Sequence, residues 1–354
     1  MNISDVLVRW YAKHKRHLPW RETSDPYLIW VSEVILQQTR VNQGIDYYYR
    51  FVERFPDVGS LARASLDEVL KSWQGLGYYT RARNLHKAAG KVWFEHGGKF
   101  PDNYDGLRQL PGVGPYTASA IASFCFDEPV AVVDGNVGRV LSRLLGIYTP
   151  INGSQGRKKL QEEAGRMINR ADPATHNQAI IEFGALQCTP SHPECGTCPF
   201  KDICHAYLND KVEWLPVKMP KKQKRHRFFH YLEIHRNGYL YMHQRNERDI
   251  WNALYQFPLI ESDRELTTGE LEKTPEWKQV FNNLHPRITA VSPIYRHTLT
   301  HQKIHARFIR IHLGGSNIHL DENYRAVSTQ ELQELAVPRL IDKYLEQENY
   351  GKNG

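Results

Sequence analysis

Hydrophobic residues recur every three to four positions through most of the first 214 residues, and beyond residue 228 they recur every second position. The first period is that of an amphipathic helix, and the second is that of a half-buried strand. The first pattern predicts helices over residues 2–14, 27–41, 80–95, 137–146, 156–170 and 172–187. The second predicts strands over residues 229–236, 239–245, 255–260, 288–296 and 305–313, with helices over 271–284 and 328–346. We therefore expect a helical part followed by a part that mixes strands and helices.

The segment between the two patterns has no period. Residues 215–227 contain Pro216, Pro220 and six Lys or Arg side chains, as in a solvated linker. We predict a helical domain over residues 1–214, a basic linker over 215–228, an α+β domain over 229–346 and a tail over 347–354. The linker's charges suit contact with a polyanion, but a solvated tether is the default interpretation.

Length and charge narrow the class of protein. A chain of 354 residues is too long for one ordinary core, which agrees with two domains. The net charge of +7 and the pI near 9.0 suit a polyanionic partner. No apolar run approaches membrane-spanning length, and residues 1–20 lack the apolar centre of a signal peptide. We expect a monomer in the cytoplasm, of bacterial type and associated with the nucleoid.

A tight turn is predicted at residues 110–118, which read Leu-Pro-Gly-Val-Gly-Pro-Tyr-Thr-Ala. Pro111 ends the preceding helix at Gln109, and Pro115 suits the first turn of the next helix. The backbone N–H groups of Gly112, Val113 and Gly114 would then collect unpaired at a helix N-terminus, where an anion such as phosphate binds. From spacing alone, an ordinary turn between two helices remains an alternative.

Two acidic residues are candidates for chemistry. Asp134 precedes Gly135 and Asn136 at the start of a predicted helix, whose dipole favours an ionised carboxylate. It could equally be an N-cap, and both roles can hold together. Glu33 lies among apolar neighbours on the helix over residues 27–41, and burial there would raise its pKa toward that of a proton donor at neutral pH. A surface glutamate is the plain alternative.

Four of the five cysteines fall within 17 residues, at Cys188, Cys195, Cys198 and Cys204. This clustering indicates a metal site rather than the scattered disulfides of a secreted protein. Zinc is one candidate, although its four-cysteine sites usually have two close pairs and this run has one. In another loop, Gly75 and Gly77 flank Leu76 and precede Tyr78, so that Tyr78 is either an exposed ring able to wedge between bases or a core tyrosine.

These motifs resemble a known family. The run over residues 110–118 resembles the helix-hairpin-helix of the endonuclease III superfamily, and the cysteine spacing is identical to that superfamily's 4Fe-4S loop. Residues 30–39 closely resemble the catalytic-acid helix of MutY-type adenine DNA glycosylases. The resemblance implies an all-α, two-part helix-hairpin-helix glycosylase domain with a 4Fe-4S loop over residues 188–204. It also implies that the α+β domain is Nudix-like and checks the opposite strand for 8-oxoguanine.

The resemblance further implies an activity and a set of site residues. The activity is monofunctional hydrolysis of the N-glycosidic bond of adenine mispaired with 8-oxoguanine or guanine in double-stranded DNA, with the base flipped out of the duplex. The implied catalytic residues are Glu33, Asp134, Tyr116 and Asn136. The implied base pocket contains Trp20, Arg21, Gln178 and Glu182, although a structural hydrogen bond is as plausible a role for Glu182. The implied DNA contacts are Gln38, Thr39, Leu76, Tyr78, Gly112, Val113, Gly114, Leu299, Thr300 and His301.

Three departures from related patterns shape these expectations. Tyr116 stands where the superfamily's lyases place a lysine, and a tyrosine cannot form a Schiff base, which disfavours the alternative of an endonuclease III-like lyase acting on oxidised pyrimidines. The α+β domain lacks the Arg-Glu-x-x-Glu-Glu run that a Nudix hydrolase needs. We therefore expect it to recognise the base on the opposite strand and not to act as a hydrolase. The damage-sensing loop carries Leu299 in place of an aromatic ring.

Overall fold

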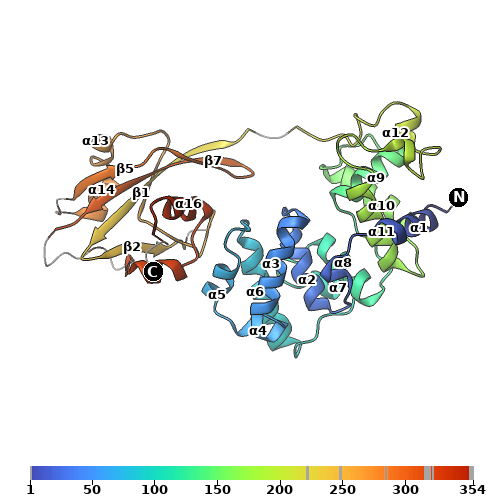
Figure 1. Cartoon of the computed structure of the whole chain (residues 1–354), viewed down its shortest axis with the longest axis horizontal. Coiled ribbons are helices and arrows are strands. Elements are labelled where there is room, and N and C mark those ends of the chain that lie inside the picture. The colour runs from blue at the N-terminus through green and yellow to red at the C-terminus, as the bar shows by residue number, and fades with distance from the viewer. Residues whose placement is uncertain are drawn as a thin grey trace. The chain divides into compact units, whose positions relative to one another are not determined.

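The computed structural model describes residues 2–220, 223–246, 249–282, 284, 286–314, 320 and 323–350 (Figure 1). It forms two compact units. Unit 1 comprises Met1–Ala64 and Asn84–Pro220, and unit 2 comprises Ser65–Arg83 and Lys221–Gly354. Residues 65–83 belong to the predicted helical domain but to unit 2 of the structure. The predicted domain boundaries stay a prediction. Part of the predicted linker (residues 221 and 222) and part of the predicted tail (351–354) lie outside the described residues.

Unit 1 is built from helices in its described residues. They are α1 (Ile3–His14), η1 (Pro19–Arg21), α2 (Pro26–Leu36), α3 (Val41–Arg54), α4 (Val58–Arg63), most of α6 (Thr80–Glu95), α7 (Tyr104–Arg108), α8 (Pro115–Phe126), α9 (Gly135–Leu145), α10 (Ser154–Met167), α11 (Pro173–Leu186), η2 (Cys195–Thr197) and α12 (His205–Leu208). Helix α11 packs against α1, α8 and α9. Helices α1, α9 and α11 share a core that includes Trp10 and Phe183, with Phe200 from the loop that follows η2. This packing fixes the N-terminus of α9 beside α11.

The predicted helix-hairpin-helix is present as α7 and α8. Helix α7 has its C-cap at Gln109, and Pro115 is the first residue of α8. Gly112 has a φ of +75°, and a Cβ there would lie 2.5 Å from the Cβ of Asn84. Only glycine fits this position without strain. Gly114 has a φ of −79°, so it does not need the conformational freedom that the sequence pattern allowed it.

Unit 2 combines a sheet with helices. Its elements are α5 (Leu66–Ser72), β1 (Arg225–Arg236), β2 (Tyr239–Gln244), β3 (Tyr255–Gln256), β4 (Leu259–Ser262), α13 (Thr268–Leu271), α14 (Pro275–Phe281), β5 (Arg287–Val291), β6 (Tyr295–Thr298), β7 (Gln302–His312), β8 (Arg325–Val327), α15 (Thr329–Glu334) and α16 (Arg339–Gln347). The sheet order is β3-β2-β1-β7-β5, with β4 on β1, β6 on β7 and β8 on β2. Strands β1 and β7 are parallel, and the other pairs are antiparallel. The α+β class predicted for this region is confirmed.

Several predicted elements are shorter than expected. The helix predicted over residues 27–41 ends at Leu36, because Gln37 leaves the helical conformation and Gln38 has a φ of +62°. The strand predicted over 288–296 is split at Pro293, which cannot donate a ladder hydrogen bond. The helix predicted over 271–284 is split into α13 and α14, and the one over 328–346 into α15 and α16. Both splits occur beside a proline, Pro275 and Pro338.

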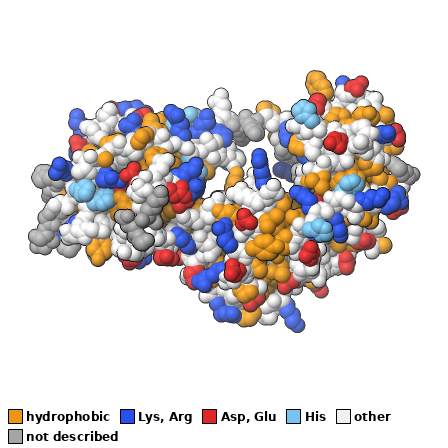
Figure 2. Space-filling view, viewed as in Figure 1, with side chains coloured by type: hydrophobic (Ala, Val, Ile, Leu, Met, Phe, Trp, Pro, Cys, Tyr) orange, Lys and Arg blue, Asp and Glu red, His pale blue; other side chains and the backbone are white. Residues whose placement is uncertain are grey.

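The surface agrees with the basic composition. Lys and Arg side chains appear on the visible faces of both units (Figure 2). Within the part of the chain that the structure describes, no helix is both long and apolar enough to cross a membrane.

Candidate active site

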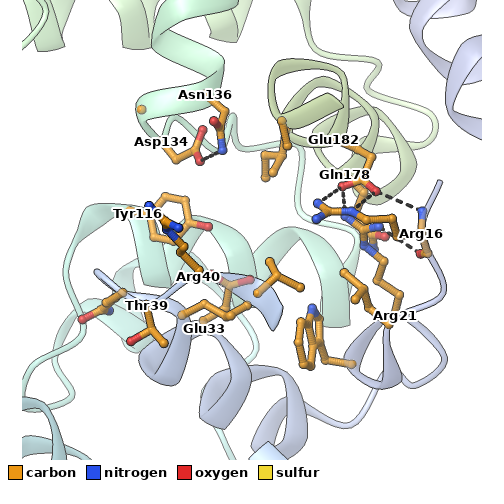
Figure 3. A pocket seen from close by; sticks show the side chains of 18 of the residues that line it. Arg16, Arg21, Glu33, Thr39, Arg40, Tyr116, Asp134, Asn136, Gln178 and Glu182 are labelled. Carbon is orange, nitrogen blue, oxygen red and sulfur yellow. Dashed lines mark hydrogen bonds and ion pairs between the residues drawn. The ribbon is translucent and has the colours of Figure 1, made fainter. Parts of the chain in front are cut away.

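A cavity of about 740 Å³ lies in unit 1 between the N-terminal segment and helices α2, α8, α9 and α11 (Figure 3). This volume is in the range of small-molecule sites and would admit a nucleobase with its sugar. The implied catalytic and base-pocket residues all line it, namely Trp20, Arg21, Glu33, Tyr116, Asp134, Asn136, Gln178 and Glu182. Residues more than 150 positions apart in the sequence therefore meet in one cavity.

Glu33 projects from α2, whose residues from Ile29 to Ile35 are all buried. The Glu33 side chain is 9% exposed and accepts a hydrogen bond from the Tyr116 hydroxyl. Burial, with the nearby charge of Asp134, raises the pKa of Glu33 to about 7, although Tyr116 and Arg21 lower it. The burial and the raised pKa predicted from the sequence are confirmed. At neutral pH a large fraction of Glu33 therefore carries a proton that it can donate.

Asp134 is the N-cap of α9. Its Oδ1 accepts from the backbone N–H of Val137 at 2.8 Å, and its Oδ2 accepts from Nδ2 of Asn136 at 2.8 Å. Burial raises the pKa of Asp134 above its ordinary value, while these hydrogen bonds and the charge of Arg139 lower it. The helix terminus thus favours the ionised form, as the sequence predicted, but burial outweighs it in the net pKa. Asp134 still accepts hydrogen bonds from several donors, whereas Glu33 accepts one from Tyr116.

Arg139 fixes the orientation of Asn136. Its Nη2 donates to Oδ1 of Asn136 at 2.9 Å, so the amide must present Nδ2 to Asp134. The same guanidinium donates to the carbonyls of Cys188 at 2.7 Å and Gly184 at 2.5 Å. Arg139 is 8% exposed, one helical turn after Asn136. The sequence analysis missed this residue, although the three-residue spacing from Asn136 on one helix face was a usable signal.

Gly184 in α11 sets the distance between α11 and Asn136. A Cβ at Gly184 would lie 2.8 Å from the Asn136 Cβ and 2.9 Å from its backbone carbonyl carbon and oxygen. Gly184→Ala is therefore expected to displace Asn136, to lower stability by about 1–3 kcal/mol and to reduce, in a single-turnover assay, the base excision that the resemblance implies. Gly165→Ala is the matched control, because that helical glycine has no atom within 4 Å of its added Cβ. Unaltered excision by Gly184→Ala would contradict the positioning role of this contact.

The far wall of the cavity is a charge cluster around Glu182 (Figure 3). Arg16 donates to both carboxylate oxygens from Nε and Nη2 at 2.8 and 2.7 Å, and Nη2 of Arg21 donates to Oε2 at 2.8 Å. Burial raises the pKa of Glu182, but these hydrogen bonds outweigh it and hold the pKa at about 2. Glu182 thus anchors two arginines at the wall. Arg16 was absent from the sequence prediction, and no local pattern pointed to a partner 166 residues away.

The other predicted base-pocket residues lie on the same side. Gln178 accepts at Oε1 from the Tyr11 hydroxyl at 2.7 Å, which fixes its amide. The buried Trp20 ring packs edge-on against Tyr48 with 5.2 Å between centroids. The turn after α2 brings Gln38 and Thr39 to the cavity lining.

At the hairpin, the anion site is smaller than the sequence predicted. The N–H of Val113 donates to the carbonyl of Leu110 at 3.1 Å and closes the turn. The expectation that all three N–H groups are unpaired is therefore wrong for Val113. Gly112 and Gly114 keep theirs without an acceptor among the described residues.

The remaining predicted DNA contacts belong to unit 2. Tyr78 is 52% exposed with a φ of +49°, and its hydroxyl lies 3.2 Å from Oγ1 of Thr300. Leu299, Thr300 and His301 form the turn between β6 and β7. Leu76 is buried, so its side chain would have to move to reach DNA. The prediction of an exposed ring at Tyr78 is confirmed over that of a core tyrosine.

Three of the four clustered cysteines lie at the edge of one core of the helical unit, although no three potential metal ligands stand together among the described residues. Cys188, Cys198 and Cys204 pack against the core shared by α1, α9, α10 and α11. The N–H of Phe200 donates to Sγ of Cys198 at 3.5 Å, and Nη1 of Arg143 donates to Sγ of Cys188 at 3.5 Å. Donors aimed at sulfur are typical of iron–sulfur sites. The residues present therefore fit such a cluster.

Comparisons with known proteins match three segments that together cover most of the chain. Residues 31–167 match the HhH-GPD superfamily of base excision DNA repair proteins, residues 188–204 match the iron-sulfur binding domain of endonuclease III, and residues 213–347 match the NUDIX domain. A solved thermostable thymine-DNA glycosylase is 28% identical with a TM-score of 0.54, covering 58% of this chain and 94% of that chain. A non-covalent endonuclease III–DNA complex, 22% identical with a TM-score of 0.51 over the same shares, supports the fold. Fold and site together define a helix-hairpin-helix base excision repair protein.

Curated relatives narrow the family. The adenine DNA glycosylase of Buchnera aphidicola subsp. Baizongia pistaciae is 34% identical over 327 residues, which cover 90% of this chain and 88% of that protein. That of the subspecies Acyrthosiphon pisum is 32% identical over 99% of this chain and 98% of that protein. The Mus musculus adenine DNA glycosylase is 46% identical over 210 residues, 57% of this chain and 41% of that protein. The chain belongs to the adenine DNA glycosylase family. The match over residues 188–204 supports one 4Fe-4S cluster as the cofactor, rather than zinc.

Proposed function

We propose that this protein excises adenine from double-stranded DNA by hydrolysing its N-glycosidic bond, and that the adenine lies opposite 8-oxoguanine or guanine. The observation that carries the proposal is the placement of two carboxyl groups with different environments in one cavity. Such a pair can divide the roles of proton donor and charge stabiliser. Since a nucleobase inside the duplex cannot reach this cavity, the adenine would be flipped out of the stack.

The chemistry follows from the two environments. Glu33 gives its proton to N7 of adenine, and the electron pair of the breaking C1′–N9 bond passes to the base. Positive charge then develops on the sugar, and Asp134, held by Asn136 and the start of α9, stabilises it. Water adds at C1′ and loses a proton, which passes to the Glu33 carboxylate or to solvent and completes the hydrolysis. Tyr116 holds Glu33 through its hydroxyl, and Arg139 holds Asn136.

The cavity favours hydrolysis over strand cleavage. No lysine is among the residues that line it, and Tyr116 has no amine for a Schiff base. A single-turnover assay on duplexes with adenine opposite 8-oxoguanine, adenine opposite guanine, or an oxidised pyrimidine tests the proposal. We expect adenine excision that becomes a strand break only after alkali. Nicking without alkali would favour the endonuclease III-like lyase, and no excision of any base would favour a DNA-binding protein without activity.

The rate of excision should depend on pH through Glu33. Since its pKa is raised to about 7 and the protonated form is the donor, the single-turnover rate is expected to fall as the pH rises through about 7. It should fall by about tenfold per pH unit once the acid is mostly ionised. A rate that rises through this range would mean that Glu33 acts as a general base, which would contradict the mechanism.

The turn between β6 and β7 would read the base opposite adenine. Thr300 offers a hydroxyl and His301 is exposed, whereas Leu299 offers no ring. Leu299→Phe is therefore expected to increase the ratio of excision opposite 8-oxoguanine to excision opposite guanine. An unchanged ratio in parallel single-turnover assays would mean that this turn does not recognise the lesion.

A further inference from the structure

One face of the β1–β7 pair is covered along only half of its length. At one end the face carries aliphatic side chains that pack against α13 and α14 in one buried core. These are Leu232, Ile234, Ile309 and Ile311, against Leu271, Trp277 and Phe281. Toward the start of both strands the same face changes to rings and cations.

The strand register places these rings and cations together. Phe228 pairs with His305, which pairs with Arg296 on β6. In the next row, His226 pairs with Lys303. Directly paired residues point to the same face of a sheet, so all five side chains share the uncovered face. His226, Arg296 and Lys303 are exposed, and Phe228 and His305 are partly exposed.

The rings present their edges rather than their faces. The His305 ring stacks on Phe228 with 4.8 Å between centroids and on His226 with 5.1 Å, at interplanar angles of 17° and 20°. Nε2 of His305 and Nδ1 of His226 lie 3.1 Å apart and share a hydrogen bond, which leaves one nitrogen on each ring for another partner. Mutual stacking leaves little ring surface for a base, but ring nitrogens suit a phosphate oxygen.

The face has an excess of positive charge. Neither Arg296 nor Lys303 makes an ion pair with a described residue, and the nearby Glu265 is paired with Arg307. Burial lowers the pKa of His305, and the positive charges of His226, Arg296 and Lys303 lower it further, against the charge of Glu265. An anion bound here would relieve this repulsion.

We propose that His226, Arg296, Lys303 and His305, here called the histidine row, bind backbone phosphates of duplex DNA. Charge complementarity supports this occupant, since the family's substrate is a polyanion. The position of the row supports this occupant too. Arg296 on β6 and Lys303 on β7 lie on either side of the Leu299–His301 turn, which is proposed to read the lesion strand. The row would hold that strand beside the turn and contribute affinity without sequence preference.

The test is the salt dependence of binding by the full-length protein. Arg296→Gln combined with Lys303→Gln removes two cations from exposed positions. Fluorescence anisotropy with an undamaged duplex, from about 50 to 300 mM salt, should show a slope of log K against log salt that is smaller by about 1.8, at about 0.9 per phosphate contact. Affinity at the low-salt end should fall by roughly tenfold. Since this duplex carries no substrate adenine, the result does not depend on the proposed excision.

The matched control carries the same charge change elsewhere in unit 2. Lys273→Gln with Lys278→Gln alters two exposed lysines, one just before α14 and one within it. The control should keep the wild-type slope, and the charge-preserving pair Arg296→Lys with Lys303→Arg should restore it. An unchanged slope for the first pair, or an equal loss in the control, would overturn the assignment. Loss of affinity confined to single-stranded DNA would overturn the duplex backbone as the occupant.

Discussion

Glu33→Gln is expected to reduce single-turnover excision of adenine by about 10²- to 10⁴-fold while duplex binding is retained. Glutamine keeps the shape of the side chain and can still accept from the Tyr116 hydroxyl, but it has no acidic proton. The measurement pairs the excision rate at saturating protein with the dissociation constant for an uncleavable duplex.

Glu162→Gln on the exposed face of α10 is the control for this substitution, and it should leave both quantities unchanged. A large loss of duplex binding in Glu33→Gln would mean that the residue is structural. A wild-type rate would exclude it as the proton donor.

The second large effect is expected for Asp134→Asn, with excision reduced by about 10²- to 10³-fold. Asparagine is as good an N-cap as aspartate, so the hydrogen bond to the Val137 N–H should persist and α9 should stay intact. What is lost is the negative charge that faces the developing sugar cation. Single-turnover rates, together with circular dichroism and the temperature of unfolding, separate the two functions of this residue.

Asp172→Asn provides the comparison, because Asp172 caps α11 through the Thr175 N–H in the same way but does not line the cavity. If Asp172→Asn and Asp134→Asn slowed excision equally, the effect would come from the loss of a charge at a helix N-terminus and not from the position of Asp134 in the cavity. The charge of Asp134 would then have no catalytic role.

The sequence was sufficient for features that local chemistry specifies. The hairpin appeared at Gly112 because a positive φ between two prolines has a clear signal. Ser65 and Glu68 form a capping box at the start of α5, with the three-residue spacing that such a box requires. The burial of Glu33 followed from its apolar neighbours along α2. Each of these depends on residues within one or two helical turns.

The sequence was insufficient where distant segments decide the outcome. The clamp of Arg16 and Arg21 on Glu182 joins residues more than 160 positions apart, and no periodicity encodes it. The net pKa of Asp134 depends on burial by other helices, which outweighs the local effect of α9. The predicted helices over residues 271–284 and 328–346 ran through the breaks at Pro275 and Pro338. These two breaks could have been predicted from the sequence, because a residue before proline rarely continues a helix.

The raised pKa of Glu33 ties unfolding to the release of a proton. In the unfolded chain this carboxyl would return toward its ordinary value of 4.5, whereas in the native cavity it titrates at about 7. Between these two values the native state holds a proton that the unfolded state gives up, so this group's contribution makes the protein less stable as the pH rises. The side chain that equips the cavity to act on DNA thus lowers the free energy of unfolding at neutral pH. Calorimetry in buffers of different ionisation enthalpy would register that proton as it leaves.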